Sequence, residues 1–257
     1  MIKEANRQIP SNIFEGMTSI SALLNAREAG INDRPILEIL FDKAKQQKKA
    51  RQFSFLARKC QELNIPLNLT DSAELERLCI GNTHGGVIAM CGDRTLPSPT
   101  CDSLPSDGFL CLLEGIEDPY NFGYALRSLY AAGCDGVLLG ERNWMSAAGV
   151  VARASAGASE SMPLWVGDAQ STIKTLKSMN YQVVCGGIRN SVSLYEANLK
   201  KPLLLVIGGE KRGISAEMLS LADQVVRIDY GRDFQGSLSA ASAATVMAFE
   251  ILRQNSK

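Results

Sequence analysis

The sequence has almost no histidine, no closely paired cysteines and no long apolar segment. His84 is the only histidine among 257 residues, which excludes a metal site built on several histidines and disfavours a histidine-dependent catalytic triad. The seven cysteines are an odd number without a Cys-x-x-Cys pair, a pattern typical of reduced cytoplasmic thiols. No apolar run approaches the roughly 20 residues of a membrane-spanning helix. We therefore expect a cytoplasmic protein that needs neither a membrane nor a metal.

The sequence also has a formal net charge of zero, since 27 basic residues balance 27 acidic ones. No global field then favours nucleic acid, and any basic surface must be local. One run does carry cations without acids, namely Lys43, Lys45, Lys48, Lys49, Arg51, Arg58 and Lys59. Such a run is typical of an RNA-binding surface or, equally, of a solvated helix face.

The domain organisation follows from one segment, residues 95–107, which contains three prolines and no periodicity. This composition predicts a linker between an N-terminal domain, 1–94, and a C-terminal domain, 108–257. Short helix and strand patterns in the first domain predict a small α/β unit. In the second domain we expect strands at 109–115, 136–140, 163–166, 182–187, 203–208 and 225–229, with helices at 121–133, 146–157, 168–179, 215–221 and 238–254. This alternation predicts an α/β fold with a mostly parallel sheet covered on both faces.

The most informative stretch is PLLLVIGGEKRGIS, residues 202–215. Its apolar run predicts a strand that is buried on both faces, and the glycines that follow allow main chain to approach a ligand closely. In open α/β sheets, ligands bind at this carboxyl end of the strands. Taken alone, the stretch also fits an ordinary turn between a strand and a helix.

Two further motifs flank it in the C-terminal domain. Asp118-Pro-Tyr-Asn-Phe-Gly-Tyr-Ala-Leu-Arg127 follows the first strand and places a guanidinium, suited to gripping phosphate, one helical turn after Gly123. A surface arginine on an amphipathic helix is the alternative. Asn121 is the expected N-cap of this helix. Near the C-terminus, Ser237 and Ser239 precede an alanine-rich helix. The N-terminus of a helix favours a bound anion. Serine is equally typical at this position as a plain helix cap.

Two common nucleotide-binding loops are missing. The sequence has neither the G-x-G-x-x-G of a dinucleotide-binding strand-turn-helix nor the G-x-x-x-x-G-K-[ST] of a P-loop. A Rossmann dehydrogenase and a P-loop NTPase are therefore both disfavoured.

The three motifs occur in an order and spacing that resembles the SpoU/TrmH family of RNA ribose 2′-O-methyltransferases, in the SPOUT superfamily. The matching elements are Asn-x-Gly-x-x-x-Arg after the first strand, Gly-Gly-Glu-x-x-Gly after an apolar strand, and Ser-Leu before an alanine-rich helix. Arg153-Ala-Ser-Ala-Gly-Ala158 resembles a further family segment. The N-terminal domain, with its His-Gly-Gly-Val segment, is similar to the family's RNA-binding extension.

This resemblance implies a fold, a cofactor and partners. The family sheet ends in a trefoil knot, an exception to the usual absence of knots. The methyl donor is S-adenosylmethionine, the substrate is ribosomal or transfer RNA, and the members form homodimers through the C-terminal domain. By the same resemblance, the cations at 43–59 would bind RNA.

The resemblance also assigns roles to individual residues. Arg127 would orient the ribose 2′-OH, with a role as base doubtful because a free guanidinium has a very high pKa. Asn121, Glu210, Ser237 and Ser239 complete the implied catalytic group. The residues that would hold the donor are Gly186, Gly187, Ile207, Gly208, Gly209, Glu210, Gly213, Ile228, Tyr230, Ser237 and Leu238.

The sequence departs from the family at two points. Ser239 stands where the family has asparagine, and Ile228-Asp229-Tyr230 stands where it has Ile-Pro-Met. Because serine lacks the amide donors of asparagine, a protein that binds RNA without methylating it is the main alternative. A methyltransferase that acts on small molecules is a third alternative. In such an enzyme the cations at 43–59 would have no functional role.

Overall fold

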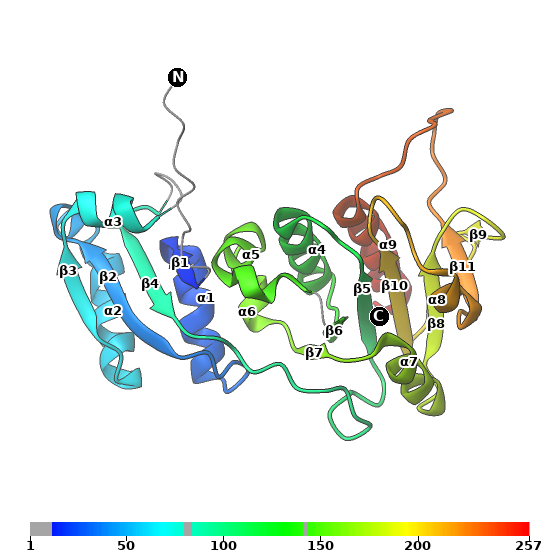
Figure 1. Ribbon diagram of the computed structural model, residues 1–257, viewed down its shortest axis with the longest axis horizontal. Helices are drawn as coiled ribbons and strands as arrows, with labels where there is room; N and C mark the ends of the chain where they lie inside the picture. Colours follow the sequence, from blue (N-terminus) through cyan, green and yellow to red (C-terminus); the bar gives the residue numbers. More distant parts are fainter. Residues whose placement is uncertain (1–11, 80–83, 141–142, 257) are drawn as a thin grey trace. The chain divides into compact units, whose positions relative to one another are not determined.

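The computed structural model describes residues 12–79, 84–140 and 143–256, which form two compact units (Figure 1). The N-terminal unit comprises the described residues up to Thr95 together with Met145–Ser161, and the C-terminal unit comprises Leu96–Trp144 together with the chain from Met162 onward. Residues 145–161 thus group with the N-terminal unit, although the sequence pattern suggested the C-terminal domain. The domain boundaries drawn from the sequence remain a prediction.

The N-terminal unit is built on a four-stranded sheet in the order β1-β4-β2-β3. Its strands are β1 (Ile13–Glu15), β2 (Ile36–Asp42), β3 (Leu67–Thr70) and β4 (Val87–Cys91). The β2–β3 pair is parallel and the other pairs are antiparallel. The helices are α1 (Gly16–Glu28), η1 (Lys43–Lys45), α2 (Ala50–Leu63), α3 (Ser72–Leu78), α5 (Ala148–Ala154) and α6 (Ala158–Ser161).

Alternation of apolar residues explains the core of this unit. Ile39 and Phe41 of β2 are fully buried, with Leu56 from α2 and Ala152 from α5 in the same cluster. Their burial takes apolar surface out of water, which is the main force that holds a small sheet and its helices together.

The C-terminal unit contains a seven-stranded sheet in the order β7-β6-β5-β10-β8-β11-β9. The strands are β5 (Phe109–Glu114), β6 (Gly136–Leu139), β7 (Leu164–Val166), β8 (Gln182–Gly186), β9 (Val192–Ser193), β10 (Leu203–Gly208) and β11 (Gln224–Arg227). Every neighbouring pair is parallel. The predicted α/β fold with a mostly parallel sheet is confirmed.

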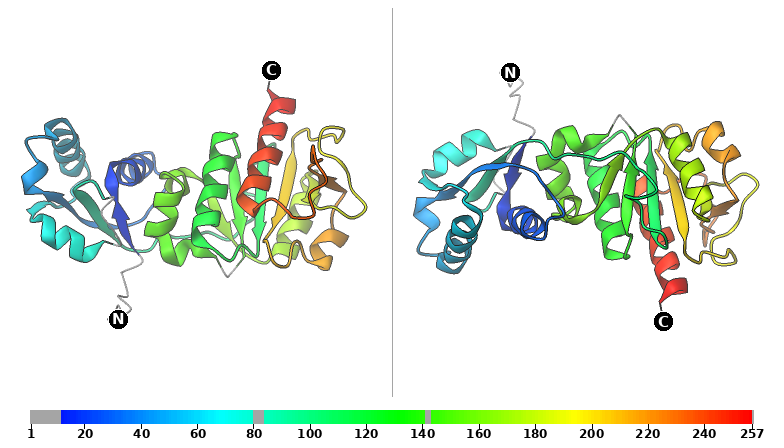
Figure 2. Two further views of the ribbon diagram at one scale, coloured as in Figure 1. Left: turned by 90° about the horizontal axis from the view of Figure 1, so that it is seen from above. Right: turned by 90° about the horizontal axis from the view of Figure 1, so that it is seen from below.

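Helices cover both faces of this sheet. Figure 2 shows α7 (Ala169–Ser178) and α8 (Ala216–Ser220) on one face, and α4 (Pro119–Ala131) and α9 (Ala240–Asn255) on the other. Leu204 and Val206 of β10 pack with Ile173 of α7 and Met218 of α8. All of Leu203–Ile207 is buried, as expected for a central parallel strand.

The predicted linker lies against the C-terminal unit. Leu104 is buried in the unit's core, the Pro105 carbonyl accepts a hydrogen bond from the Tyr181 hydroxyl (2.7 Å), and the Pro97 carbonyl accepts one from Val166 N (3.0 Å). A further 3-10 turn, η2 (Trp144–Ala147), precedes α5. None of the described helices is both long enough and apolar enough to cross a membrane.

Candidate active site

The centre of the site is the glycine turn that follows β10. A side-chain carbon added at Gly208 would overlap the main chain of Gly213, and one added at Gly209 would overlap the Gly115 carbonyl oxygen. Gly213 N donates to the Gly209 carbonyl (2.9 Å), which closes the turn, and Gly213 has φ +64°. Glycine is therefore required at 208 and 209 for close approach and favoured at 213 by its conformation. The turn presents Glu210 beside the ends of β5 and β10.

Glu210 links the three sequence motifs. Its Oε1 accepts hydrogen bonds from Asn121 Nδ2 (3.0 Å) on α4 and from Ala240 N (3.2 Å) in the first turn of α9. A carboxylate at a helix N-terminus is favoured because it satisfies a main-chain N–H that has no partner within the helix. Segments that begin near residues 118, 208 and 237 therefore meet at one carboxylate.

The amide of Asn121 is available for this contact because another residue caps α4. The sequence suggested Asn121 as the N-cap, but the helix begins at Pro119, and Asp118 accepts the capping hydrogen bond from Asn121 N (2.8 Å). Proline is well suited to the first helical position because its fixed φ is helical. The identity of the cap was thus wrong, and the actual cap leaves the Asn121 side chain free to reach Glu210.

A pocket of about 720 Å³ lies at the carboxyl ends of β8, β10 and β11. All eleven residues that the family resemblance assigned to the donor line this pocket: Gly186, Gly187, Ile207, Gly208, Gly209, Glu210, Gly213, Ile228, Tyr230, Ser237 and Leu238. Burial raises the pKa of Cys185, one residue before this edge, to about 12, so this thiol is not a nucleophile at neutral pH.

Some residues that line the pocket were not predicted from the sequence. Ile188 and Arg189 follow Gly187 directly and could have been found from the rule that ligands bind beyond the strand ends. Leu219 of α8 and Met247 of α9 also line the pocket, but nothing in their own sequence surroundings distinguishes them from core residues.

The loop that follows β11 closes one side of the pocket. The Tyr230 hydroxyl accepts a hydrogen bond from Leu238 N (3.2 Å), which ties the two ends of the loop together. The rings of Tyr230 and Phe234 lie 5.7 Å apart, and Gly236 packs directly against the Phe234 ring. Tyr230, at one of the two departures from the family pattern, therefore shapes the loop.

Ser237 and Ser239 differ in position although they are two residues apart. Ser237 is exposed and lines the pocket. Ser239 does not line it, because its hydroxyl caps α9 by accepting from Ser242 N (3.2 Å). Serine is among the preferred residues for such a cap. The structure therefore places Ser239 in support of the helix and not in the pocket wall.

Arg127 lies outside this pocket. It is exposed on α4 and forms no hydrogen bond or ion pair with the residues that the structure describes. Asn121, Glu210 and Ser237 are brought together around the glycine turn, whereas Arg127 is not joined to them within one chain.

The predicted RNA-binding cations lie in the N-terminal unit and differ in environment. Lys43, Lys48, Arg51 and Arg58 are exposed, whereas Lys45 and Lys49 are partly buried. Lys59 is buried and its ammonium group bonds both carboxylate oxygens of Glu28 at 2.6 Å. Lys59 therefore serves the fold, and the other six cations remain candidates.

Comparisons with known proteins agree with this arrangement. The sequence profile of the SpoU rRNA Methylase family matches residues 108–249, and that of RNA 2′-O ribose methyltransferase substrate binding matches residues 15–96. A 23S rRNA (guanosine-2′-O-)-methyltransferase RlmB from Burkholderia sp is 30% identical over 249 residues, covering 95% of this chain and 97% of the relative.

Solved structures share the fold. A crystal structure of an RNA 2′-O ribose methyltransferase has a TM-score of 0.76 and 23% identity, covering 97% of this chain and 96% of that one. An AdoMet-bound rRNA methyltransferase from Sinorhizobium meliloti has a TM-score of 0.76 and 21% identity, covering 95% of this chain and 88% of the other. The glycine turn, the carboxylate that joins the three motifs and the matching profile lead to one conclusion: this chain belongs to the SpoU rRNA Methylase family.

Proposed function

We propose that this protein transfers a methyl group from S-adenosylmethionine to a ribose 2′-OH of structured RNA, ribosomal or transfer. The observation that carries the proposal is Glu210, whose carboxylate joins Asn121 and Ala240 N beside the pocket of about 720 Å³. The names of the relatives, which describe 2′-O-methylation of rRNA, support it.

The pocket suits the donor chemically. Glycines at 186, 208 and 209 expose main-chain groups for hydrogen bonds, and a side-chain carbon at Gly186 would press on Met247. Ile207 and Leu238 provide apolar surface for an adenine ring, and Glu210 provides negative charge for a sulfonium ion. When bound, S-adenosylmethionine supplies a methyl group already activated by positive sulfur.

The residues of this chain then have to position the hydroxyl. A ribose 2′-OH is a weak nucleophile, so holding it in line with the methyl carbon supplies much of the rate. We assign Arg127 to orient the ribose and its neighbouring phosphate, because guanidinium binds phosphate through two parallel hydrogen bonds. Asn121 and Glu210 hold the start of α4 and the start of α9 in fixed relation to the pocket.

The remaining parts of the proposal concern assembly. A homodimer formed through α4 and α9 would bring the exposed Arg127 to the partner's donor pocket, and the chain would pass through the trefoil knot of its family. The N-terminal unit would bind RNA, and the protein would act in the cytoplasm, where its free cysteines stay reduced.

Calorimetry and turnover of Arg127→Ala test this function. S-adenosylmethionine should bind with micromolar-scale affinity to both proteins, whereas the variant should lose methyl transfer by about 100-fold or more, because a positioning group is gone. Arg77→Ala, an exposed arginine on α3, is the matched control and should keep full turnover.

The outcomes separate the alternatives. Absence of binding heat at millimolar donor would contradict the donor site. Donor binding without transfer to RNA would favour the protein that binds RNA without methylating it, the alternative motivated by Ser239.

A further inference from the structure

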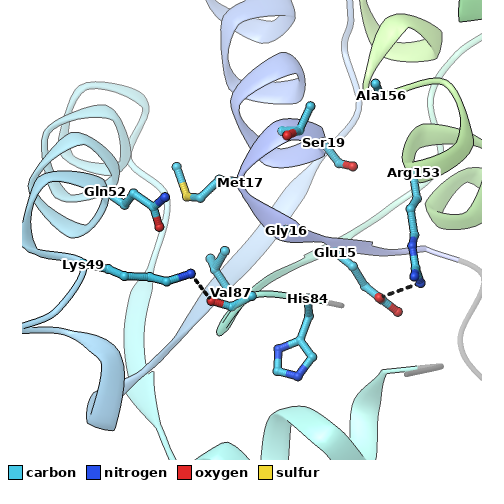
Figure 3. Close-up of a pocket in the computed structure, with 12 residues that line it drawn as sticks. Glu15, Gly16, Met17, Ser19, Lys49, Gln52, His84, Val87, Arg153 and Ala156 are labelled. Atoms are coloured by element: carbon cyan, nitrogen blue, oxygen red, sulfur yellow. Dashed lines mark hydrogen bonds and ion pairs between the residues drawn. The ribbon is translucent and has the colours of Figure 1, made fainter. Parts of the chain in front are cut away.

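A second pocket lies within the N-terminal unit, away from the glycine turn in sequence. It has a volume of about 300 Å³ and is lined by the start of α1, the start of α2, the turn at His84 and Gly85, and the end of α5 (Figure 3). Two sequence features that were separate, the cation run and the His-Gly-Gly-Val segment, meet here.

The turn forces this meeting. Gly85 and Gly86 have φ values of +65° and +91°, which favour glycine. A side-chain carbon at Gly86 would come within 2.6 Å of Lys45 Cδ, so the main chain lies directly on the cationic segment. Lys49 Nζ donates to the Gly85 carbonyl (2.6 Å), which holds its ammonium group at the pocket wall (Figure 3). Its other two N–H groups have no partner among the residues that the structure describes.

His84 is a buried donor in the same wall. Only 3% of its surface is exposed, and its Nδ1 accepts a hydrogen bond from Gly86 N (3.1 Å), so the ring proton lies on Nε2. Burial lowers the pKa of His84, and the Lys45 charge lowers it further, so the ring is neutral at physiological pH. Its Nε2–H has no acceptor among the described residues, and because His84 lines the pocket this donor is available to a ligand there.

The first turn of α1 adds main-chain donors. This helix has 13 residues, its N-cap Glu15 makes no side-chain capping bond, and its first turn contains no acidic residue. Gly16, Met17 and Thr18 of this turn line the pocket. A helix N-terminus without a cap offers free N–H groups to an anion.

The charges and hydrogen-bond acceptors of the pocket further limit the class of ligand that it could bind. Lys49 and Arg153 bring two positive charges and Glu15 one negative charge, with Arg153 Nη1 bonded to Glu15 Oε2 (3.1 Å) (Figure 3). Gln52 Oε1 is buried without a hydrogen-bond partner in the described structure. An anion would satisfy the donors, and a hydroxyl next to that anion would satisfy Gln52. A phosphodiester with an adjacent ribose hydroxyl, as in RNA, carries both groups.

We infer that this pocket binds one nucleotide of the RNA substrate, with its phosphodiester at Lys49, His84 and the start of α1, and its sugar hydroxyl at Gln52. The inference rests on the proposed function, since it needs RNA as the substrate. On a diffuse basic surface, neighbouring cations would contribute about equally to RNA binding. A binding pocket instead requires Lys49, which lines it, to contribute more than its neighbours of equal charge.

Binding of end-labelled ribosomal RNA fragments to full-length variants tests this inference. Lys49→Gln should raise the dissociation constant about tenfold, because a charged hydrogen bond is lost. The slope of log K against log salt should become shallower by about 1, the value expected for one phosphate contact. Lys48→Gln is the comparison variant: Lys48 is the preceding residue, is exposed and does not line the pocket, so as a peripheral RNA-binding cation it should weaken binding by less than about threefold, compared with about tenfold for Lys49→Gln.

Gln52→Met provides a second readout that does not depend on charge. Removing a buried acceptor that has no partner should not lower the melting temperature, yet it should weaken RNA binding about fivefold. Lys49→Arg, which keeps the charge, should recover part of the lost affinity, and all four variants should bind S-adenosylmethionine as the wild type does.

Equal losses for Lys48→Gln and Lys49→Gln, with Gln52→Met unchanged, would overturn the inference and leave the proposed function intact. Wild-type protein that binds no RNA would instead contradict the proposed function itself. Saturable binding of inorganic phosphate that Lys49→Gln removes, combined with unchanged RNA affinity of that variant, would show a site for a free anion and also overturn the inference.

Discussion

At the scale of single residues, the N-terminal unit contains a buried ion pair. Arg34 and Glu160 are 1% and 0% exposed, and Arg34 Nε bonds Glu160 Oε2 at 2.9 Å. Asn32 Nδ2 donates to the same carboxylate, and the Arg34 guanidinium lies 5.1 Å from the centre of the Phe14 ring. These contacts attach α6 to the strand that begins after Arg34.

Removing one partner of this pair should be costly. Glu160→Gln leaves the Arg34 charge buried without a counter-charge, so the free energy of unfolding should fall by about 3 kcal/mol or more. Urea unfolding followed by circular dichroism measures the change. Glu74→Gln breaks the exposed pair with Arg77 and should cost less than about 1 kcal/mol. A Glu160→Gln protein as stable as the Glu74→Gln control would contradict this account of the pair.

The location of a ligand edge was easier to predict from the sequence than the buried charges, for a physical reason. Glycines at strand ends indicate such an edge locally, and the eleven residues that the family resemblance assigned to the donor all line one pocket, although their role remains a prediction. Lys59 was placed among RNA-binding cations because its partner Glu28 is 31 residues away in sequence. Ion pairs between distant residues cannot be read from local charge patterns.

At the scale of elements, the glycine turn fixes the geometry of the site. Gly209→Ala should displace the turn from the Gly115 carbonyl and weaken S-adenosylmethionine binding at least about tenfold, with a lower melting temperature. Gly231→Ala is the matched control, because no atom lies within 4 Å of an added carbon there. Calorimetry checks both variants, and unchanged donor affinity in Gly209→Ala would contradict the role given to the turn.

A carboxylate at the start of β11 should make stability depend on pH. Burial acts to raise the pKa of Asp223, but hydrogen bonds from Lys177 Nζ (2.7 Å) and Val183 N (2.8 Å) outweigh it and hold the pKa below its ordinary value. A pKa lowered by folding means that the ionised form stabilises the fold above pH about 3.8, and that this stability is lost as pH falls through the folded pKa.

Asp223→Asn should therefore lower the free energy of unfolding by about 0.5–1 kcal/mol at pH 7, a small value because the carboxylate is partly exposed. The difference from wild type should shrink towards pH 3. Urea midpoints at several pH values measure it, with Asp102→Asn as an exposed control. A difference that grows as the pH falls would show that the sign is wrong.

Most elements were predictable because their periodicity is strong and glycine or proline marks their ends. The strands β1 and β9 were not predicted, since three and two residues are too few to show alternation. The helix expected at 146–157 ends at Ala154, because Ala156 and Gly157 adopt positive φ values and Gly157 packs against Ala22 of α1. That break depends on tertiary contact, which a local pattern does not contain.

At the scale of the whole molecule, the sheet order could not be predicted from the sequence. β10 lies between β5 and β8, although about 90 residues separate it from β5, and alternation of helices and strands allows many such orders. Parallel pairing, by contrast, followed from the alternation of strands and helices along the chain.

Exposed apolar side chains on α4 and α9 suggest how two copies would meet. Tyr120 and Tyr124 of α4 and Phe249 and Leu252 of α9 are between 37% and 48% exposed, and the Thr245 and Ser128 hydroxyls bond the two helices at 2.6 Å. Sedimentation should give the mass of a dimer, and Phe249→Glu should shift it towards the monomer because a charge would be buried at the interface. A wild-type monomer at micromolar concentration would contradict the proposed dimer.

The central claim is that Glu210, the glycine turn and Arg127 together serve methyl transfer to RNA. The most direct test is incubation of the protein with labelled S-adenosylmethionine and total RNA from cells that lack it, followed by mapping of the label. The account predicts label on the 2′-oxygen of one defined ribose, and its loss with Arg127→Ala. Label on a base, or donor binding with no label on any RNA, would contradict it.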